Sequence, residues 1–182
     1  ADYWHNAVSV ILGNGNGTFQ VEQEFAAGAL PTAVAVGDVN GDGHGDLVTS
    51  NYDSDTVSVL LGNGLGEFGT PKTYGVADGP EMVALEDVDS DGDLDLLTPT
   101  YYANCVTLLI NDGSGAFGVP RTMPTGAGTA FLALGDLNGD SHADIVTANA
   151  EGQNLSVLIS NGNGSFATQQ LLQLGLKPYG VA

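Results

Sequence analysis

Positive charge is almost absent from this sequence. Its 182 residues include three Lys and Arg against 22 Asp and Glu, which gives a formal net charge of −19 at pH 7. A surface with this charge repels the phosphate backbone of nucleic acids, so we expect no nucleic-acid partner. Long apolar stretches are missing as well, and none approaches the roughly 18 residues of a membrane-spanning helix. We therefore expect no membrane span.

The sequence also lacks the common catalytic motifs. It has three histidines and contains no His-Glu-x-x-His, no Gly-x-Ser-x-Gly and no Cys-His pairing. Its Gly-Asn-Gly stretches lack the Gly-Lys-Ser/Thr ending of a phosphate-binding loop. Clustered carboxylates can serve glycoside hydrolysis, but their spacing here suits a metal better. We predict that no residue is catalytic and that the protein is not an enzyme.

Acidic residues, by contrast, recur in three nearly identical nonapeptides that begin 49 residues apart. These are Asp38-Val-Asn-Gly-Asp-Gly-His-Gly-Asp46, Asp87-Val-Asp-Ser-Asp-Gly-Asp-Leu-Asp95 and Asp136-Leu-Asn-Gly-Asp-Ser-His-Ala-Asp144. Each has oxygen-bearing side chains at positions one, three, five and nine, and Gly or Ser at position six permits a sharp turn. This pattern predicts loops that bind a hard cation, usually Ca²⁺.

The EF-hand is the main alternative, because its loop also begins Asp-x-Asp/Asn-x-Asp-Gly. An EF-hand loop ends with a bidentate Glu at position 12 and lies between helices. Position 12 here is Thr49, Thr98 or Thr147, and each loop is followed by a short apolar run that favours a strand. We therefore expect the loops to join strands.

Other segments follow the same period. Apolar runs occupy 8–12, 57–61, 106–110 and 155–159, and Gly/Asn-rich hairpin signals precede Phe19, Phe68, Phe117 and Phe166. One unit reads as four short strands, near 32–37, 46–52, 57–61 and 68–74. We predict an all-β fold of four-stranded antiparallel blades, arranged as a propeller or a solenoid. The repeated apolar strands should form the core between the blades.

On these residues, the chain resembles proteins of the FG-GAP/VCBS repeat type, which include integrin α-subunit propellers and many bacterial secreted proteins. The resemblance rests on the acidic loop, on the strand Val-Ser-Val-Leu-Leu-Gly-Asn-Gly and on the Gly-x-Phe that follows it. It covers essentially the whole chain. It implies a Ca²⁺-stabilised β-propeller, usually of seven blades, that works in adhesion or extracellular binding.

The resemblance also implies the ligands of three Ca²⁺ ions. The side-chain ligands are Asp38, Asn40, Asp42 and Asp46 in the first loop, Asp87, Asp89, Asp91 and Asp95 in the second, and Asp136, Asn138, Asp140 and Asp144 in the third. The seventh residue, which is His44, Asp93 or His142, is expected to offer its backbone carbonyl. We expect the two histidine side chains to point to solvent.

Cys105 is the single cysteine, which excludes an internal disulfide. It falls at the same place in the repeat as Ala7, Thr56 and Asn154, so we interpret it as a small residue at the start of a strand. Bound Ca²⁺ would then supply the bracing that disulfides give to other secreted domains.

The period divides the chain into a partial unit at 1–30, full blades at 31–79, 80–128 and 129–177, and the start of another unit at 178–182. Four periods of 49 residues need 196 residues, 14 more than the chain has. The partial unit would leave open strand edges. We expect the missing strands to come from the rest of a longer chain or from a neighbouring subunit, in a ring or a filament.

Two further sets of residues are candidate recognition sites. Aromatic residues follow the second strand in three of the units and can stack on a sugar or anchor a protein, although packing between blades is an alternative. These aromatic residues are Tyr3, Trp4, Tyr52, Tyr101 and Tyr102. The N-glycosylation pattern occurs at Asn16, Asn154 and Asn163, two of which lie in the hairpin signature.

These observations predict an extracellular or cell-surface protein. We expect a calcium-stabilised propeller segment that acts as an adhesive or structural binding module, with a protein or a glycan as its partner. Two alternatives remain at this point. One is a carbohydrate-binding propeller, and the other is a non-catalytic propeller attached to a secreted enzyme.

Overall fold

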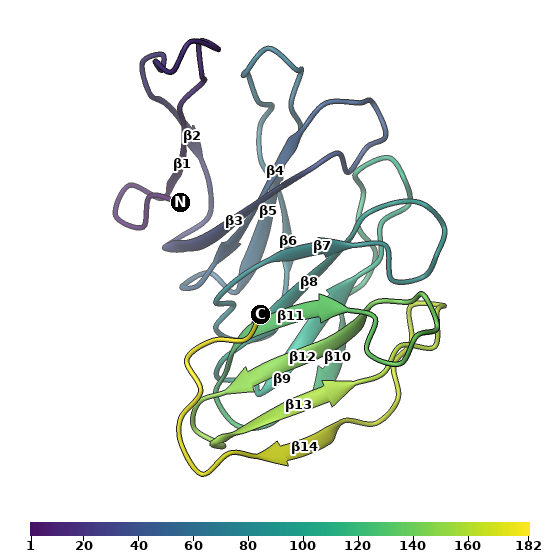
Figure 1. Cartoon of the computed structure of the whole chain (residues 1–182). Helices are drawn as coiled ribbons and strands as arrows, with labels where there is room; N and C mark the ends of the chain where they lie inside the picture. Colours follow the sequence, from purple (N-terminus) through teal and green to yellow (C-terminus); the bar gives the residue numbers. More distant parts are fainter.

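The computed structural model describes residues 1–182 and contains strands, turns and loops but no helix. No helix long and apolar enough to cross a membrane is therefore present. The strands form one two-stranded and three four-stranded sheets (Figure 1). They are β1 (Ala7–Val10), β2 (Gln23–Ala26), β3 (Pro31–Gly37), β4 (Asp46–Asn51), β5 (Thr56–Leu60), β6 (Lys72–Gly75), β7 (Ala84–Glu86), β8 (Asp95–Thr100), β9 (Cys105–Leu109), β10 (Arg121–Pro124), β11 (Thr129–Gly135), β12 (Asp144–Asn149), β13 (Asn154–Leu158) and β14 (Gln170–Gln173).

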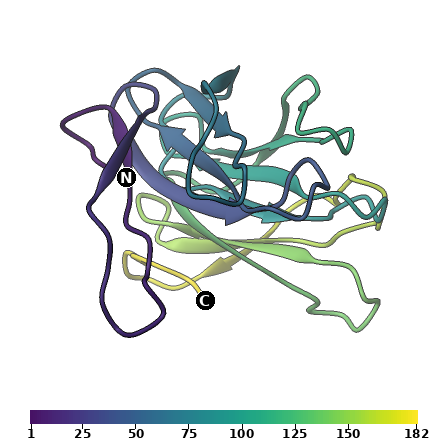
Figure 2. The same cartoon turned by 90° about the horizontal axis from the view of Figure 1, so that it is seen from above.

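Each four-stranded sheet is an antiparallel meander in which consecutive strands are neighbours. The orders are β3-β4-β5-β6, β7-β8-β9-β10 and β11-β12-β13-β14, and β1 pairs with β2. Figure 1 shows the sheets following one another along the chain, and Figure 2 shows the same succession from above. The prediction of an all-β fold built from four-stranded, propeller-like blades is confirmed.

The turn between the second and third strands of each unit is tight and repeats almost unchanged. It contains a residue with a positive φ of 51° to 55°, which is Asn6, Asp55, Asn104 or Gln153. Asn and Asp tolerate this left-handed conformation better than other residues with a side chain. The regular use of one turn keeps the strand register the same in successive blades.

The last strand of each blade is shorter than the sequence predicted. A strand near 68–74 was expected, but β6 begins at Lys72, and Phe68 instead forms an isolated bridge with Gly62. Pro71 lies between the two, but proline is not required for this end point, because β14 begins at the equivalent residue, Gln170, although Gln169 precedes it. Pro120 lies at the same place before β10.

The hydrophobic core lies between the blades. One cluster joins Val48, Val57 and Val59 of the first full blade to Leu96 and Leu109 of the second. A second cluster joins the second full blade to the third, and a third links the partial unit to the first full blade. The first and second full blades therefore each bury one face against the sheet before them and the other against the sheet after them.

The four repeated phenylalanines do not share one environment. Phe117 is buried with 8% of its surface exposed, and Phe68 and Phe166 are half-buried, whereas Phe19 is 70% exposed. Phe19 therefore lies outside the core. Phe68 and Phe117 are covered by an aromatic ring from the last strand of the blade before. Phe19 has no aromatic partner of this kind.

The contrast between two equivalent phenylalanines can be tested by truncation. Phe117→Ala should lower the free energy of unfolding by about 3–5 kcal/mol, because it removes a ring from the core between two blades. Phe19→Ala, at the equivalent position, should change it by less than about 0.5 kcal/mol. Urea denaturation of both variants measures the difference. Equal losses of unfolding free energy in the two variants would contradict the assignment of Phe117 to the core and of Phe19 to the surface.

Candidate metal centres

The three acidic loops join the first and second strands of each blade. They lie between β3 and β4, between β7 and β8, and between β11 and β12, and Figure 1 shows all three on the same side of the stack. The threonines at position 12 are fully buried within the second strands. The loops thus join strands, and no EF-hand is present.

The carboxylate at position one organises each loop by accepting backbone N–H groups. Asp38 accepts from Asp42 at 3.2 Å and from Gly43 at 2.8 Å. Asp87 accepts from the same two positions of its loop, at 3.2 and 3.0 Å. Asp136 accepts from all four amides at positions three to six, and these bonds lower its pKa. The sharp turn at position six has the expected positive φ, between 70° and 97°.

Positions three and five are linked by an amide in two of the loops. Nδ2 of Asn40 donates to Oδ2 of Asp42 at 3.0 Å, and Nδ2 of Asn138 donates to Oδ2 of Asp140 at 2.8 Å. The backbone N–H of His44, followed by the Asn40 amide, lowers the pKa of Asp42. In these two loops a neutral donor therefore offsets part of the negative charge.

The second loop has no such donor, because Asp89 stands where the other loops have Asn. Oδ1 of Asp89 is buried and has no hydrogen-bond partner. Burial, and next the charge of Asp91, raises the pKa of Asp89. Carboxylate oxygens of Asp87, Asp89 and Asp95 lie within 4.8 Å of one another. Three converging carboxylates and a buried oxygen without a donor fit a hard divalent cation.

The structure does not bring the acidic groups of the other two loops equally close. Asp38, Asp42 and Asp46 do not offer three carboxylate oxygens within 4.8 Å of one another, and neither do Asp136, Asp140 and Asp144. In these loops the predicted ligand at position three is the amide oxygen of an Asn side chain. That oxygen accepts the N–H of position five, at 3.1 Å in the first loop and 2.9 Å in the third.

The carboxylate at position nine is fully buried in every loop and uses both oxygens. Asp46 accepts the N–H of Val39 at 2.9 Å and that of Gly62 at 2.7 Å. Asp95 and Asp144 accept the equivalent pairs of amides at 2.7 to 3.1 Å. Burial raises the pKa of Asp95 to about 6, although its two N–H partners act in the opposite direction. This residue ties the loop to the following hairpin.

The side chain at position seven lies over the hairpin of its own blade, while His44 remains exposed and His142 is half-buried. A Cβ placed on Gly64 would collide with the His44 imidazole, and one on Gly162 would collide with His142. Asp93 lies against the equivalent hairpin glycine, Gly113. Because a glycine leaves space above the hairpin, the side chain at position seven rests on it.

Each loop except the third is covered by the hairpin of the next blade. The Cβ position of Gly115 lies 3.5 Å from Cβ of Asn40, and that of Gly164 lies 3.2 Å from Cβ of Asp89. Val39 and Val88, at position two, are accordingly 1% and 2% exposed, whereas Leu137 is 56% exposed. The acidic loops therefore also form part of the contact between blades.

Sequence comparison identifies the family from these same segments. Residues 1–49 and 38–98 match the FG-GAP-like repeat, and residues 127–165 match the FG-GAP repeat. The chain belongs to the FG-GAP repeat family. All three acidic loops lie within the matched segments, and the resemblance inferred from the sequence is confirmed.

Two solved structures share the fold of these FG-GAP repeats. One concerns specific recognition of non-reducing terminal N-acetylglucosamine by an Agrocybe aegerita lectin, with 22% identity, a TM-score of 0.64, and coverage of 94% of this chain and 48% of the other. The second is an auxiliary nutrient binding protein from Bacteroides ovatus, with 13% identity, a TM-score of 0.56, and coverage of 89% and 45%. The FG-GAP chain spans about half the length of these solved structures. No curated protein sequence matches it.

The predicted rim aromatics partly connect neighbouring FG-GAP blades. The hydroxyls of Tyr52 and Tyr102 are hydrogen bonded at 2.9 Å, and the Tyr101 hydroxyl donates to Glu151 at 3.0 Å. Their hydrogen bonds raise the pKa of both Tyr52 and Tyr101. Trp4 is 83% exposed and Tyr102 59%, so these two retain most of their surface for contact with a ligand.

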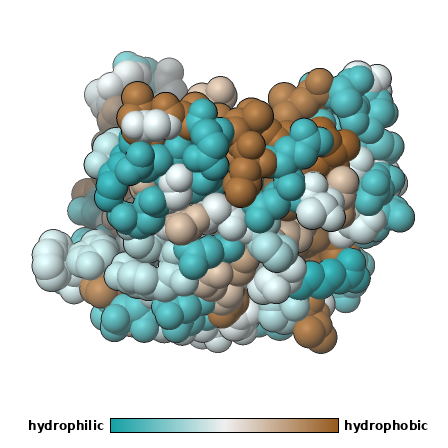
Figure 3. Space-filling model, turned by 90° about the horizontal axis from the view of Figure 1, so that it is seen from below, coloured by the Kyte–Doolittle hydropathy of each residue, from teal (hydrophilic) through white to brown (hydrophobic).

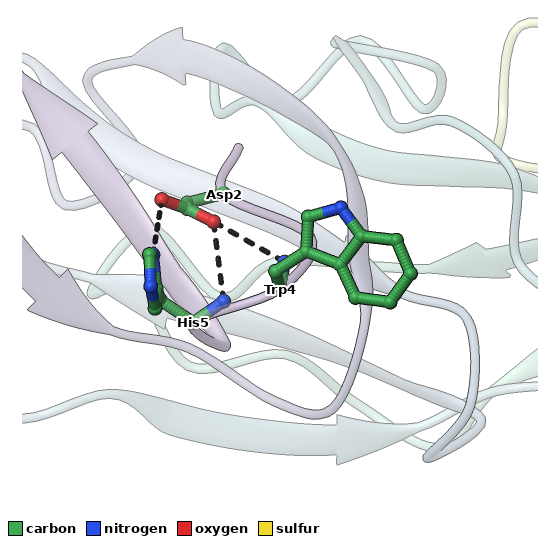
Figure 4. A network of polar contacts seen from close by, with 3 residues as sticks. All are labelled: Asp2, Trp4 and His5. Atoms are coloured by element: carbon green, nitrogen blue, oxygen red, sulfur yellow. Dashed lines mark hydrogen bonds and ion pairs between the residues drawn. The ribbon is translucent and has the colours of Figure 1, made fainter.

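A polar cluster beside Trp4 was not predicted. Asp2 accepts the backbone N–H groups of Trp4 and His5 at 3.2 and 3.1 Å, and its other oxygen lies 2.8 Å from Nδ1 of His5 (Figure 4). The His5 hydrogen bond lowers the pKa of Asp2, and Asp2 in turn raises that of His5. Glu24 lies within 4.8 Å of both groups. No periodic signal marks this cluster, since the other units have different residues there.

The remaining candidate residues have distinct settings. Asn16 and Asn163 are exposed in hairpins, whereas Asn154 is 6% exposed in β13, with its Oδ1 accepting from Asn149. The Asn154 amide thus lies inside the sheet, where no glycan could be attached. Cys105 is buried at the start of β9, with its sulfur 3.0 Å from the hydroxyl of Thr100.

The role of position nine can be separated from metal binding by working in excess EDTA. Asp46→Asn should lower the free energy of unfolding by about 1–3 kcal/mol, because one of two buried acceptors is replaced by a donor that faces an N–H group. Asp42→Asn makes the same chemical change at an exposed position of the same loop and should have little effect. Thermal and urea melts of both variants provide the measurement. If Asp46→Asn left the free energy of unfolding unchanged, the structural role of Asp46 would be contradicted.

Proposed function

We propose that this FG-GAP segment binds Ca²⁺ in its acidic loops and serves as a binding module of an extracellular or cell-surface protein. The observation that carries the proposal is the buried Oδ1 of Asp89, which has no donor and lies among the carboxylates of the second loop. A buried anionic oxygen is costly unless it is paired or coordinates a metal.

The proposed ligands are the side chains at positions one, three, five and nine of each loop and the backbone carbonyl at position seven. When bound, Ca²⁺ compensates the repulsion between carboxylates and holds the loop closed. The residues of the chain have already arranged part of the site. Position one orders the turn through backbone N–H groups, and position nine anchors the loop to the hairpin.

The proposed role is adhesion or structural binding, and it assigns no catalytic residue to the chain. The exposed apolar surface supports a polypeptide partner. Leu171 and Leu172 of β14 and Leu174 and Leu176 beyond it are 42% to 63% exposed, and apolar atoms gather on the face seen from below (Figure 3). We propose that strands of a longer chain or of a neighbouring subunit cover such surfaces. A secreted enzyme that carries this segment would have its active site elsewhere.

Carbohydrate binding is a second candidate, and the exposure of Trp4 and Tyr102 favours it. Flat aromatic faces that remain open to solvent can pack on the apolar face of a sugar. One of the structures with this fold is described as a lectin that recognises N-acetylglucosamine. In this second reading the glycan is bound at the rim, beside the turn formed by Asp2, Trp4 and His5.

Calcium removal tests the main proposal. At a free Ca²⁺ concentration about 100 times Kd, each occupied site should stabilise the fold by about 2.7 kcal/mol. The melting temperature measured by calorimetry should therefore fall clearly when Ca²⁺ is replaced by excess EDTA. An unchanged melting temperature would contradict the proposal of Ca²⁺ binding.

The variant Asp89→Asn provides the matched control for that experiment. The new amide can donate to Asp91 as Asn40 donates to Asp42, so we expect a higher melting temperature in EDTA than for the wild type. The stabilisation by Ca²⁺ should be smaller, since one anionic ligand is lost. Lower stability in EDTA together with an unchanged response to Ca²⁺ would contradict the assignment of Asp89 as a ligand.

A glycan array tests the second candidate. If the rim binds sugars, Trp4→Ala should weaken the retained signals by about tenfold or more, as loss of a stacking aromatic side chain does. Val119→Ala is the control, because Val119 is 85% exposed but lies in the loop before β10. The absence of any bound glycan, or equal losses in both variants, would exclude this role.

A further inference from the structure

The last strand of each blade presents one side chain to the hairpin phenylalanine of the next blade. Phe25 of β2 packs on Phe68 with ring centroids 5.1 Å apart, and Tyr74 of β6 packs on Phe117 with centroids 5.4 Å apart. Both pairs are edge-to-face, at 77° and 78°. The next residue of this series, 49 positions after Tyr74, is Met123 of β10. Two interfaces thus contain an aromatic pair, and the third has a thioether in place of one ring.

Tyr74 shows what a phenol ring gains at this position. Its hydroxyl donates to the carbonyl of Gly115 at 3.3 Å and accepts the N–H of Phe117 at 3.2 Å. Nζ of Lys72 lies 5.1 Å from the centroid of its ring. The ring therefore has an aromatic edge contact, two backbone hydrogen bonds and a cation over its face.

The interface that contains Met123 has the only pocket of the molecule. Its volume is about 330 Å³, and Met123, Pro124, Leu158 and Phe166 form its apolar wall, with Thr122 and Gln169 among the polar residues. At the preceding interface Tyr74 stands in the place of Met123 and packs on Phe117, and no pocket is found there. The flexible side chain of Met123 leaves part of this space open.

The backbone groups that serve the Tyr74 hydroxyl are present at this pocket without a partner. The equivalents of Phe117 N–H and Gly115 C=O are Phe166 N–H and Gly164 C=O, and neither forms a hydrogen bond within the protein. The equivalent of Lys72 is Arg121, whose Nη1 lies 3.8 Å from the Cβ position of Gly164. The pocket thus lies beside the same donor, acceptor and cation as the Tyr74 site.

We propose that this pocket binds a small phenol, which occupies the place that the Tyr74 ring occupies in the blade before. The ring packs on Phe166, and its hydroxyl bonds to Phe166 N–H and Gly164 C=O. Small-molecule pockets begin at roughly 300 Å³, so this one accepts a single ring. A pyranose suits the pocket less well, because its equatorial hydroxyls would face an apolar wall. No lining residue belongs to a metal loop, so the inference does not depend on Ca²⁺ binding.

Titration with p-cresol, which has the structure of the tyrosine side chain, tests this proposal in the 182-residue chain. The chain contains two methionines, so ¹³C-methyl labelling of methionine gives two NMR signals. Met82 is the internal reference, since it does not line the pocket and precedes β7, at the opposite edge of the sheet from β10. We expect a saturable shift of the Met123 signal, a nearly constant Met82 signal, and binding of toluene about tenfold weaker.

Two exchanges between the equivalent positions sharpen the test. Met123→Tyr should fill the pocket and abolish p-cresol binding in ligand-detected NMR, with a melting temperature at least as high as that of the wild type. Tyr74→Met should open a second pocket, so that the added methionine methyl signal also shifts with p-cresol. The first variant fills a cavity and should fold, so the proposal stays testable even where the second variant fails to fold.

Four results would overturn the proposal. These are the absence of a saturable Met123 shift up to the solubility limit of p-cresol, equal binding of toluene, unchanged p-cresol binding in Met123→Tyr, and saturation of the Met123 signal by methyl N-acetyl-β-glucosaminide in place of p-cresol. Toluene binding would indicate a merely apolar void, and the glucosaminide would indicate a sugar site.

Discussion

A buried carboxylate with two backbone donors fixes each blade at the end of its acidic loop. Burying a charge is costly unless its hydrogen-bond partners are already in place. For Asp46 one donor comes from the second residue of the loop and the other from the start of the hairpin. The carboxylate is satisfied only when both turns have formed. Loop and hairpin therefore become ordered together, and the exposed acidic side chains obtain their places from this anchor.

The same turns also hold neighbouring blades together. The hairpin of one blade lies on the acidic loop of the blade before it, close to Asn40 in one case and to Asp89 in the other. The side chain at position seven rests on the hairpin of its own blade. A cation in such a loop would thus act on two interfaces at once, within the blade and between blades. On the proposal of Ca²⁺ binding, this contact would brace a stack of small sheets in a chain without disulfides.

Most of the architecture could be predicted from the sequence, because turn chemistry and strand patterns repeat every 49 residues. What the period could not predict depends on neighbours in space. Phe19 and Phe117 occupy equivalent positions, yet only Phe117 has a ring packed over it. The spacing also predicted three equal sets of ligands. Only the second loop brings three carboxylates together, because Asp89 has replaced an amide that would donate to its neighbour.

The contact between blades has a direction. A hairpin covers the loop of the preceding blade and never that of the following one, as the exposure of Leu137 beside the buried Val39 and Val88 shows. The two surfaces that meet are therefore different from each other. Contacts between unlike surfaces are heterologous. When they are repeated, each new copy is added in the same direction, and the result is a closed ring or an open filament. Copies of this fold that associate through these surfaces must therefore join head to tail, so one unlike surface stays uncovered at each end unless the assembly closes into a ring.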